Sequence, residues 1–130
     1  QTKKNGVQDG VADFVIPLCA TIHLSGSTIT LVSCSMAIMM LSGMAIDFKT
    51  IFPFILMLGI TMVAAPGVPG GAVIAALGLL ETMLGFPPSM LSLMIALYVA
   101  QDSFGTATNV TGDGAIALVV NRISGFKLKR

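Results

Sequence analysis

Three long stretches without charge dominate the pattern of hydrophobic and polar positions along the chain. No Asp, Glu, Lys or Arg occurs over residues 14–46, 50–80 or 82–101. A helix needs about 20 apolar residues to cross a bilayer, so each stretch is long enough to lie within a membrane. The pattern therefore predicts an all-α integral membrane protein, a multi-pass protein of the cell membrane.

Charged residues, glycines and prolines at the ends of these stretches divide the chain into five parts. The sequence predicts a polar cytoplasmic lead (1–13), a transmembrane helix with a polar break (14–46), a hairpin (50–86), a transmembrane helix with an unwound polar stretch (88–121) and a basic cytoplasmic tail (122–130). The chain has neither a starting Met nor a cleavable signal pattern, so we expect a piece of a longer protein.

The apolar stretch over residues 50–80 is interrupted at its centre. Two prolines and three glycines fall within residues 66–71, which excludes a continuous helix there. Both chain ends carry clustered Lys or Arg, and positive charge favours the cytoplasm, so we expect one of the three segments not to cross. We predict that residues 50–86 form a re-entrant hairpin whose tip faces protein or a water-filled cavity. A kinked crossing helix stays open as the alternative.

Composition narrows the possible classes further. Apolar types make up 55% of the 130 residues and charged types 10%, with a mean hydropathy of +0.92. These values exclude an ordinary water-soluble globule and a disordered chain, and they indicate the lipid bilayer as a partner. Seven Lys and Arg nearly cancel six Asp and Glu, so we expect no nucleic-acid partner. Cys19 and Cys34 lie in the first apolar stretch, where we expect buried thiols rather than a disulfide framework.

Residues 101–114 form a polar run inside an apolar context. At about 100° per residue, four of its side chains fall within roughly 60° of one another on a helix. These are Asp102, Thr106, Asn109 and Asp113. Ionisable groups at membrane depth are costly, so this stripe predicts an ion or substrate path. An alternative for Asp113 is a position near the interface, paired with Arg122.

Two carboxylates within a membrane could also indicate an aspartyl protease. Asp102 and Asp113 are 11 residues apart in the sequence. That separation is about 16 Å along a helix, whereas a catalytic dyad must nearly touch to share a proton. We therefore predict a protein that is not an enzyme, in which carboxylates bind a substrate ammonium or a hard cation.

A second polar run, over residues 20–30, contains the chain's single histidine, His23. An imidazole is the one side chain here that titrates near neutral pH without perturbation, so His23 is a candidate proton carrier. The alternative is a neutral imidazole that hydrogen-bonds a hydroxyl or carbonyl in the helix bundle.

Three motifs together carry a family resemblance: PLCATIHLSGS at 17–27, APGVPGG at 65–71 and QDSFGTATNVTGD at 101–113. In order and spacing they resemble the dicarboxylate/amino acid:cation symporter family, which includes the glutamate transporters, over nearly the whole chain. The resemblance implies broken transmembrane helices plus a re-entrant helical hairpin. The chain would be the C-terminal part of a transport core, comprising the seventh helix, the second hairpin and the eighth helix. It further implies an elevator mechanism and a homotrimer of the full-length protein.

The resemblance also assigns roles to individual residues. The expected contacts to an amino acid substrate are Ser27, Gly67, Val68, Asp102, Thr106 and Asn109, with Asp102 binding the substrate ammonium. The expected oxygen ligands of a coupling sodium ion are Thr21, Met62, Val63, Ala65, Asn109 and Asp113, several of them through the backbone. His23 makes a proton the alternative coupling ion.

Two departures from the family pattern sharpen the prediction. Residues 23–27 read HLSGS where the family has an NMDGT-like motif, so an amide and a carboxylate associated with sodium are missing. Gly105 stands where members that carry acidic amino acids have an arginine. The resemblance is closest to the L-cystine symporter branch, so we expect import of L-cystine. An acidic amino acid or C4-dicarboxylate symporter, and a non-transporting membrane packing fragment, are the alternatives.

Overall fold

The computed structural model describes residues 1–125. These residues form a short 3-10 helix, η1 (Thr2–Asn5), and five α-helices, with no strand among them. The prediction of an all-α chain is confirmed. The expected basic tail lies largely outside the described residues, because only its first four positions, 122–125, belong to them.

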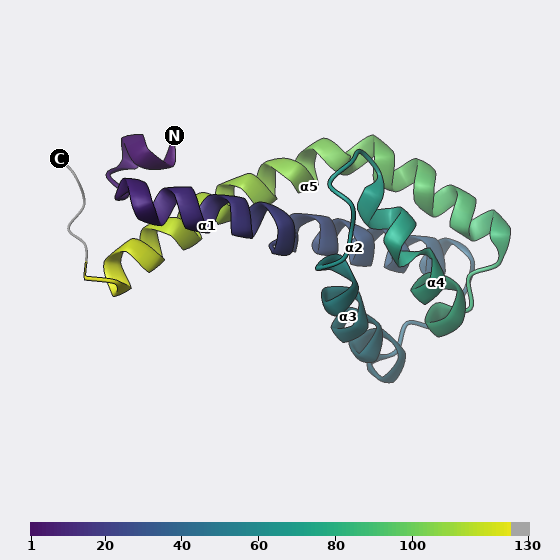
Figure 1. Cartoon of the computed structure of the whole chain (residues 1–130). Helices are drawn as coiled ribbons and strands as arrows, with labels where there is room; N and C mark the ends of the chain where they lie inside the picture. The colour runs from purple at the N-terminus through teal and green to yellow at the C-terminus, as the bar shows by residue number, and fades with distance from the viewer. Residues whose placement is uncertain (126–130) are drawn as a thin grey trace.

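Helices α1 (Asp9–Ile22) and α2 (Ser25–Leu41) follow one another, separated by the two residues His23 and Leu24. Figure 1 shows the long helix α5 (Pro88–Ile123) running beside both of them. The break falls inside the polar run that the sequence singled out. Helix α5 thereby brings residues near the end of the chain against residues near its beginning.

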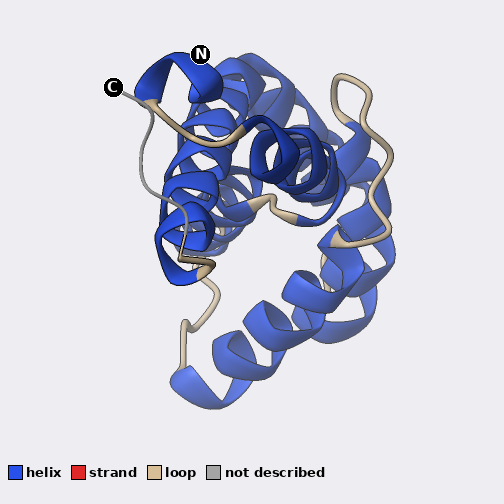
Figure 2. Ribbon diagram, turned by 60° about the vertical axis from the view of Figure 1, so that its left-hand side comes forward, coloured by secondary structure: helices blue, strands red, loops and turns tan. Residues whose placement is uncertain are grey.

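The hairpin is formed by α3 (Phe48–Met62) and α4 (Gly71–Leu84), which are joined by a loop over residues 63–70. Helix α3 begins at a side-chain cap, because the backbone N–H of Thr50 donates to Asp47 Oδ1 at 2.9 Å. Helix α4 ends at Gly85, whose φ of 70° suits glycine. Both helices of the hairpin contact α2, and α4 also contacts α5. Figure 2 shows the described chain as helices joined by loops. The re-entrant placement of the hairpin in a membrane stays a prediction.

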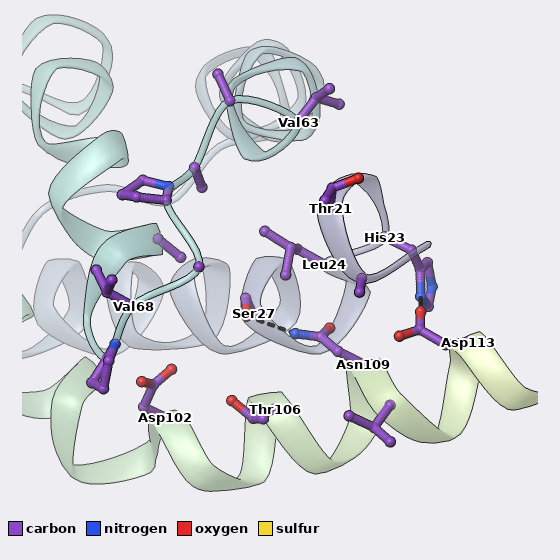
Figure 3. Close-up of a pocket in the computed structure, with 18 of the residues that line it drawn as sticks. Thr21, His23, Leu24, Ser27, Val63, Val68, Asp102, Thr106, Asn109 and Asp113 are labelled. Carbon is purple, nitrogen blue, oxygen red and sulfur yellow. Dashed lines mark hydrogen bonds and ion pairs between the residues drawn. The ribbon is translucent and has the colours of Figure 1, made fainter. Parts of the chain in front are cut away.

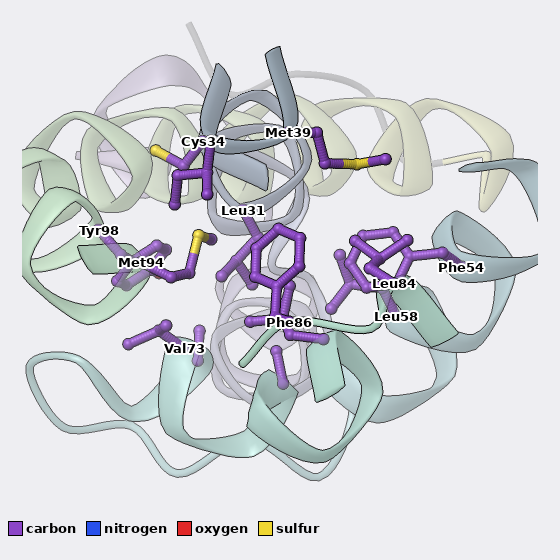
Figure 4. Close-up of a cluster of buried hydrophobic side chains, with 14 of the residues drawn as sticks. Leu31, Cys34, Met39, Phe54, Leu58, Val73, Leu84, Phe86, Met94 and Tyr98 are labelled. Atoms are coloured by element: carbon purple, nitrogen blue, oxygen red, sulfur yellow. The ribbon is translucent and has the colours of Figure 1, made fainter. Parts of the chain in front are cut away.

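An apolar cluster holds the hairpin against α2 and α5 (Figure 4). Phe54 and Leu58 from α3, Leu31 from α2 and Met94 from α5 are all fully buried within it. Phe86, in the α4–α5 connection, is also buried there, at 2% exposure. The hairpin base is therefore fixed by packing, while its loop is left to face the middle of α5.

Helices α2 and α5 approach closely at two glycines. A Cβ atom on Gly26 would collide with the carbonyl oxygen of Gly105 and the Cβ of Thr108. Small residues allow helix backbones to come together in this way and are typical of membrane-helix contacts. The close approach places the beginning of α2 directly against the polar stripe of α5.

One predicted feature of residues 88–121 is wrong. Helix α5 is continuous through the polar run, and the expected unwound stretch is not present. Gly105 and Gly112 face neighbouring residues of the α1–α2 segment closely, so they make room for contacts without ending the helix. Thr108 and Thr111 donate hydrogen bonds to carbonyl oxygens one turn earlier in α5 and so remain compatible with it.

Among the described residues, one segment is long and apolar enough to cross a membrane by length and composition. It is Asp9–Leu41, which comprises α1 and α2. Helices α3 and α4 are apolar but shorter. The crossing expected for residues 88–121 stays a prediction.

Candidate substrate and cation site

A cavity of about 510 Å³ lies between the α1–α2 break, the hairpin loop and the middle of α5. Figure 3 shows Asp102, Thr106, Asn109 and Asp113 along one side of it and Val68 of the hairpin loop across from them. Of the twelve predicted site residues, eleven line this cavity: Thr21, His23, Ser27, Val63, Ala65, Gly67, Val68, Asp102, Thr106, Asn109 and Asp113. The side chain of the twelfth, Met62, is buried in the apolar cluster instead.

Asn109 joins α5 to the beginning of α2. Its Oδ1 accepts a hydrogen bond from the backbone N–H of Gly26 at 2.8 Å, and its Nδ2 donates to Ser27 Oγ at 3.0 Å. Helix α2 has no side-chain cap from its own N-cap residue, Leu24. The first N–H groups of a helix lack intrahelical partners, so Asn109 supplies from another helix the cap that allows α2 to begin there.

Asp113 pairs with His23 across the helix break. Asp113 Oδ1 lies 2.8 Å from His23 Nδ1, and the carboxylate side chain is only 9% exposed. A Cβ on Gly112 would collide with the imidazole, so the absence of a side chain there leaves room for the His23 ring beside α5. The partner of Asp113 is therefore His23, and the alternative pairing with Arg122 is not the one present.

Asp102 faces the hairpin loop. Its Oδ2 accepts a hydrogen bond from the backbone N–H of Gly70 at 3.1 Å, and the side chain is half-buried. Gly70 adopts a positive φ of 74°, which suits glycine and directs its N–H toward α5. Asp102 thus ties α5 to the segment that covers the cavity, far from the His23–Asp113 pair.

Sequence reasoning missed one cavity residue, Tyr98. Tyr98 is 1% exposed and lines the cavity. Tyr98 precedes Asp102 by four residues and so lies on the same helix face. That spacing could have added it to the polar stripe, but Tyr98 precedes the polar run and lies in the apolar part of the sequence.

The model of the sodium:dicarboxylate symporter family matches residues 1–123 of this chain. The chain belongs to this family. The family and its named relatives are transporters rather than enzymes, in agreement with the prediction made from the sequence.

Three similar proteins illustrate the relationship. Neutral amino acid transporter B(0) of Rattus norvegicus is 31% identical over 111 residues, which cover 85% of this chain and 20% of the relative. Neutral amino acid transporter A of Bos taurus is 29% identical over 128 residues, 98% of this chain and 24% of the relative. Excitatory amino acid transporter 1 of Homo sapiens is 28% identical over 127 residues, 98% of this chain and 23% of the relative. The chain thus spans about a fifth to a quarter of these relatives. No solved structure matches it significantly.

Symporters of this family require a place for a cation, and two groups of oxygen atoms at the cavity have suitable chemistry. The first group lines one side of the cavity and comprises Thr21, Val63 and Ala65. The Thr21 hydroxyl donates to Leu18 O at 2.7 Å, so the lone pairs of its oxygen remain able to coordinate a cation. Asn109 and Asp113 form the second group. Hard cations prefer such hydroxyl, carbonyl and carboxylate oxygens. Within residues 1–125, no cluster of three His, Cys, Asp or Glu side chains suits a metal ion.

Proposed function

We propose that this chain is the C-terminal part of the transport core of a secondary active symporter that imports an amino acid, with L-cystine as the substrate. The observation that carries the proposal is the cavity in which Asp102, half-buried, faces the hairpin loop across a space lined by Ser27, Thr106 and Asn109. A half-buried carboxylate is a suitable partner for a substrate ammonium, and the surrounding hydroxyl and amide groups can bind a carboxylate or a second amino acid end.

The lining of the cavity favours a substrate without an acidic side chain. None of its residues within the described chain is Lys or Arg, and Gly105 is buried with no side chain at the centre of α5. A distal carboxylate would therefore find no cationic partner, and a buried unpaired charge is strongly unfavourable. L-cystine carries no net charge, because the ammonium of its distal amino acid end balances the distal carboxylate, so it needs no Lys or Arg there.

Substrate binding and loop closure would be linked through Asp102. A substrate ammonium would bind the Asp102 carboxylate, which accepts a hydrogen bond from Gly70 of the loop. The loop over residues 63–70 would then close over the bound ligand. Gly67 and Val68 would then contact the substrate through their backbone. In the full-length protein, we propose that this core moves by an elevator mechanism within a multi-pass homotrimer in the cell membrane.

The coupling ion would be sodium or a proton. Sodium would be held by oxygen atoms of Thr21, Met62, Val63 and Ala65 at the hairpin end of the cavity. Asn109 and Asp113 would form a second position, where His23 already lies 2.8 Å from the carboxylate. A cation at Asp113 must displace this imidazole or share the carboxylate with it, so His23 decides between sodium and proton coupling.

A second candidate function is symport of an acidic amino acid or a C4-dicarboxylate. It is favoured by the name of the matching family and by the similarity to excitatory amino acid transporter 1. It requires a cationic partner for the distal carboxylate from a part of the full-length protein that lies outside this chain.

Uptake by the full-length protein in proteoliposomes tests these proposals. Labelled L-cystine and labelled L-aspartate are supplied separately, with a sodium gradient or a proton gradient imposed alone. We expect L-cystine to accumulate under one of the gradients, with aspartate a poor competitor. Accumulation of aspartate alone would replace the substrate proposal with the second candidate. If no gradient drives uptake of either compound or of neutral amino acids, the chain belongs to a non-transporting packing module.

A further inference from the structure

Asn109 of α5 directs both ends of its side-chain amide to the first turn of α2. Its Oδ1 accepts from the backbone N–H of Gly26 at 2.8 Å, and its Nδ2 donates to Ser27 Oγ at 3.0 Å (Figure 3). Asn109 is only 7% exposed and lies in the wall of the cavity. Because both polar atoms of the amide already have partners on α2, the effect of Asn109 on a ligand passes mainly through this helix.

The hydroxyl of Ser27 differs from its neighbours on α2 in what it binds. The hydroxyls of Thr28, Thr30 and Ser35 donate to carbonyl oxygens one turn earlier, at 2.8, 2.9 and 2.7 Å. Among the described residues, Ser27 donates to no such carbonyl, and its oxygen accepts from Asn109 at the cavity wall instead. A serine hydroxyl has one proton to donate, so that proton is kept for an acceptor in the cavity rather than for the backbone of α2.

We propose that Asn109 is a positioning residue that holds the Ser27 hydroxyl toward the carboxylate of the bound amino acid. The inference rests on the proposed function, since it concerns how the same cavity recognises its substrate. Asp102 is the partner proposed for the ammonium, and the carboxylate at the other side of the amino acid only accepts hydrogen bonds. Ser27 lines the same cavity and is suited to donate, because its oxygen already accepts from Asn109. Without Asn109, the serine hydroxyl would turn to a carbonyl of the preceding turn, as its neighbours do.

The substitution Asn109→Ala removes the donor to Ser27, while water from the cavity can replace the amide oxygen at the Gly26 N–H. Uptake is measured with the full-length transporter at a saturating concentration of the coupling ion, because the proposed function also assigns Asn109 to a cation position. We expect the KM for the transported amino acid to rise about tenfold, the worth of a hydrogen bond to a charged group, with Vmax changed less than twofold. Ser27→Ala should raise KM by a similar factor. Ser35→Ala is the matched control, because this buried hydroxyl donates to Leu31 O at 2.7 Å outside the cavity and its loss should leave KM unchanged.

A double-mutant cycle separates this positioning role from a cap that only stabilises α2. If Asn109 acts through Ser27, adding Asn109→Ala to Ser27→Ala raises KM less than twofold further. Where Asn109→Ala gives no inserted protein, Asn109→Asp takes its place, because the carboxylate keeps an acceptor for Gly26 and removes the donor to Ser27, and the same two results are expected. Multiplication of the single effects, or an unchanged KM in the single Asn109 variant while the wild-type protein transports an amino acid normally, would overturn the proposal and leave the proposed function intact. Absence of amino acid uptake by the wild-type protein would overturn both.

Discussion

Asp102 and Asp113 lie on the same face of α5 and line the same cavity, yet they have different kinds of partner. Asp102 accepts a hydrogen bond from the backbone N–H of Gly70, in the hairpin loop. Asp113 pairs with the imidazole of His23, at the break between two packed helices. A carboxylate held by a loop is suited to a ligand whose entry moves that loop, whereas one held by a titratable ring is suited to a coupling ion. The difference in partners, rather than in residue type, separates the two proposed roles.

The largest expected effect comes from Asp102→Asn. Loss of the charge removes the partner of the substrate ammonium, and breaking such a pair costs about 3–5 kcal/mol, equivalent to at least about a hundredfold weaker binding. We expect no measurable amino acid uptake by the full-length protein, with membrane insertion retained because the amide can still accept from Gly70. Uptake with wild-type affinity would contradict the role of Asp102.

Asp113→Asn should behave differently from Asp102→Asn. The amide keeps an oxygen for His23 but loses the charge that a cation requires, so we expect the apparent affinity for the coupling ion to fall by about tenfold or more. Uptake should recover in part at high concentration of that ion, which can be measured as the ion dependence of the initial rate. If a higher ion concentration restores uptake in neither Asp113→Asn nor Asp102→Asn, or restores it equally in both, the two carboxylates do not have separate roles.

Gly112→Ala should change the ion dependence of uptake, which involves His23 and Asp113, and leave substrate binding at Asp102 unaffected. The added Cβ collides with the imidazole, and the ring can move away, so the hydrogen bond to Asp113 is lost while the helices stay packed. The loss of one hydrogen bond predicts about a fivefold change in the ion dependence of uptake, with little change in substrate KM. Gly114→Ala is the control, because its Cβ would meet nothing within 4 Å. Equal effects of the two variants would exclude a specific role for the His23–Asp113 contact.

The smallest effect is expected at an ion pair outside the cavity. Lys3 Nζ lies 2.6 Å from Asp13 Oδ1, and the two side chains are 48% and 66% exposed. The hydrogen bond from Lys3 to Asp13 raises the pKa of the ammonium, so any stabilisation is present below the ordinary lysine pKa and is lost as the pH rises through the raised value. At neutral pH, Asp13→Asn should change neither the KM nor the ion dependence more than twofold, because exposed pairs contribute little. A larger change would extend the functional region beyond the cavity.

Much of the cavity follows from local sequence patterns. Four positions at helical spacing predicted the stripe on α5, and the proline and glycine residues over 66–71 predicted the loop of the hairpin. These features depend on the helical period and on backbone restrictions, which a single sequence contains.

The partners of the polar groups could not be predicted in the same way. His23 and Asp113 are 90 residues apart, and the cap that Asn109 provides to α2 spans 83 residues. Such contacts depend on how the helices pack. The sequence also predicted an unwound stretch in α5, whereas the helix is continuous. Glycine weakens an isolated helix, but here it allows a neighbouring segment to approach closely.

The most direct test of the central claim, that an amino acid binds beneath the hairpin loop, is protection of a cysteine introduced by Val68→Cys. Val68 is 59% exposed and lines the cavity, whereas Cys19 and Cys34 are buried, so the parent protein is the background control. In the full-length transporter, bound L-cystine or another transported amino acid should slow labelling by a membrane-impermeant thiol reagent. The protection should disappear when Asp102→Asn is added. Labelling at the same rate with and without substrate, under conditions in which the protein transports it, would contradict the account.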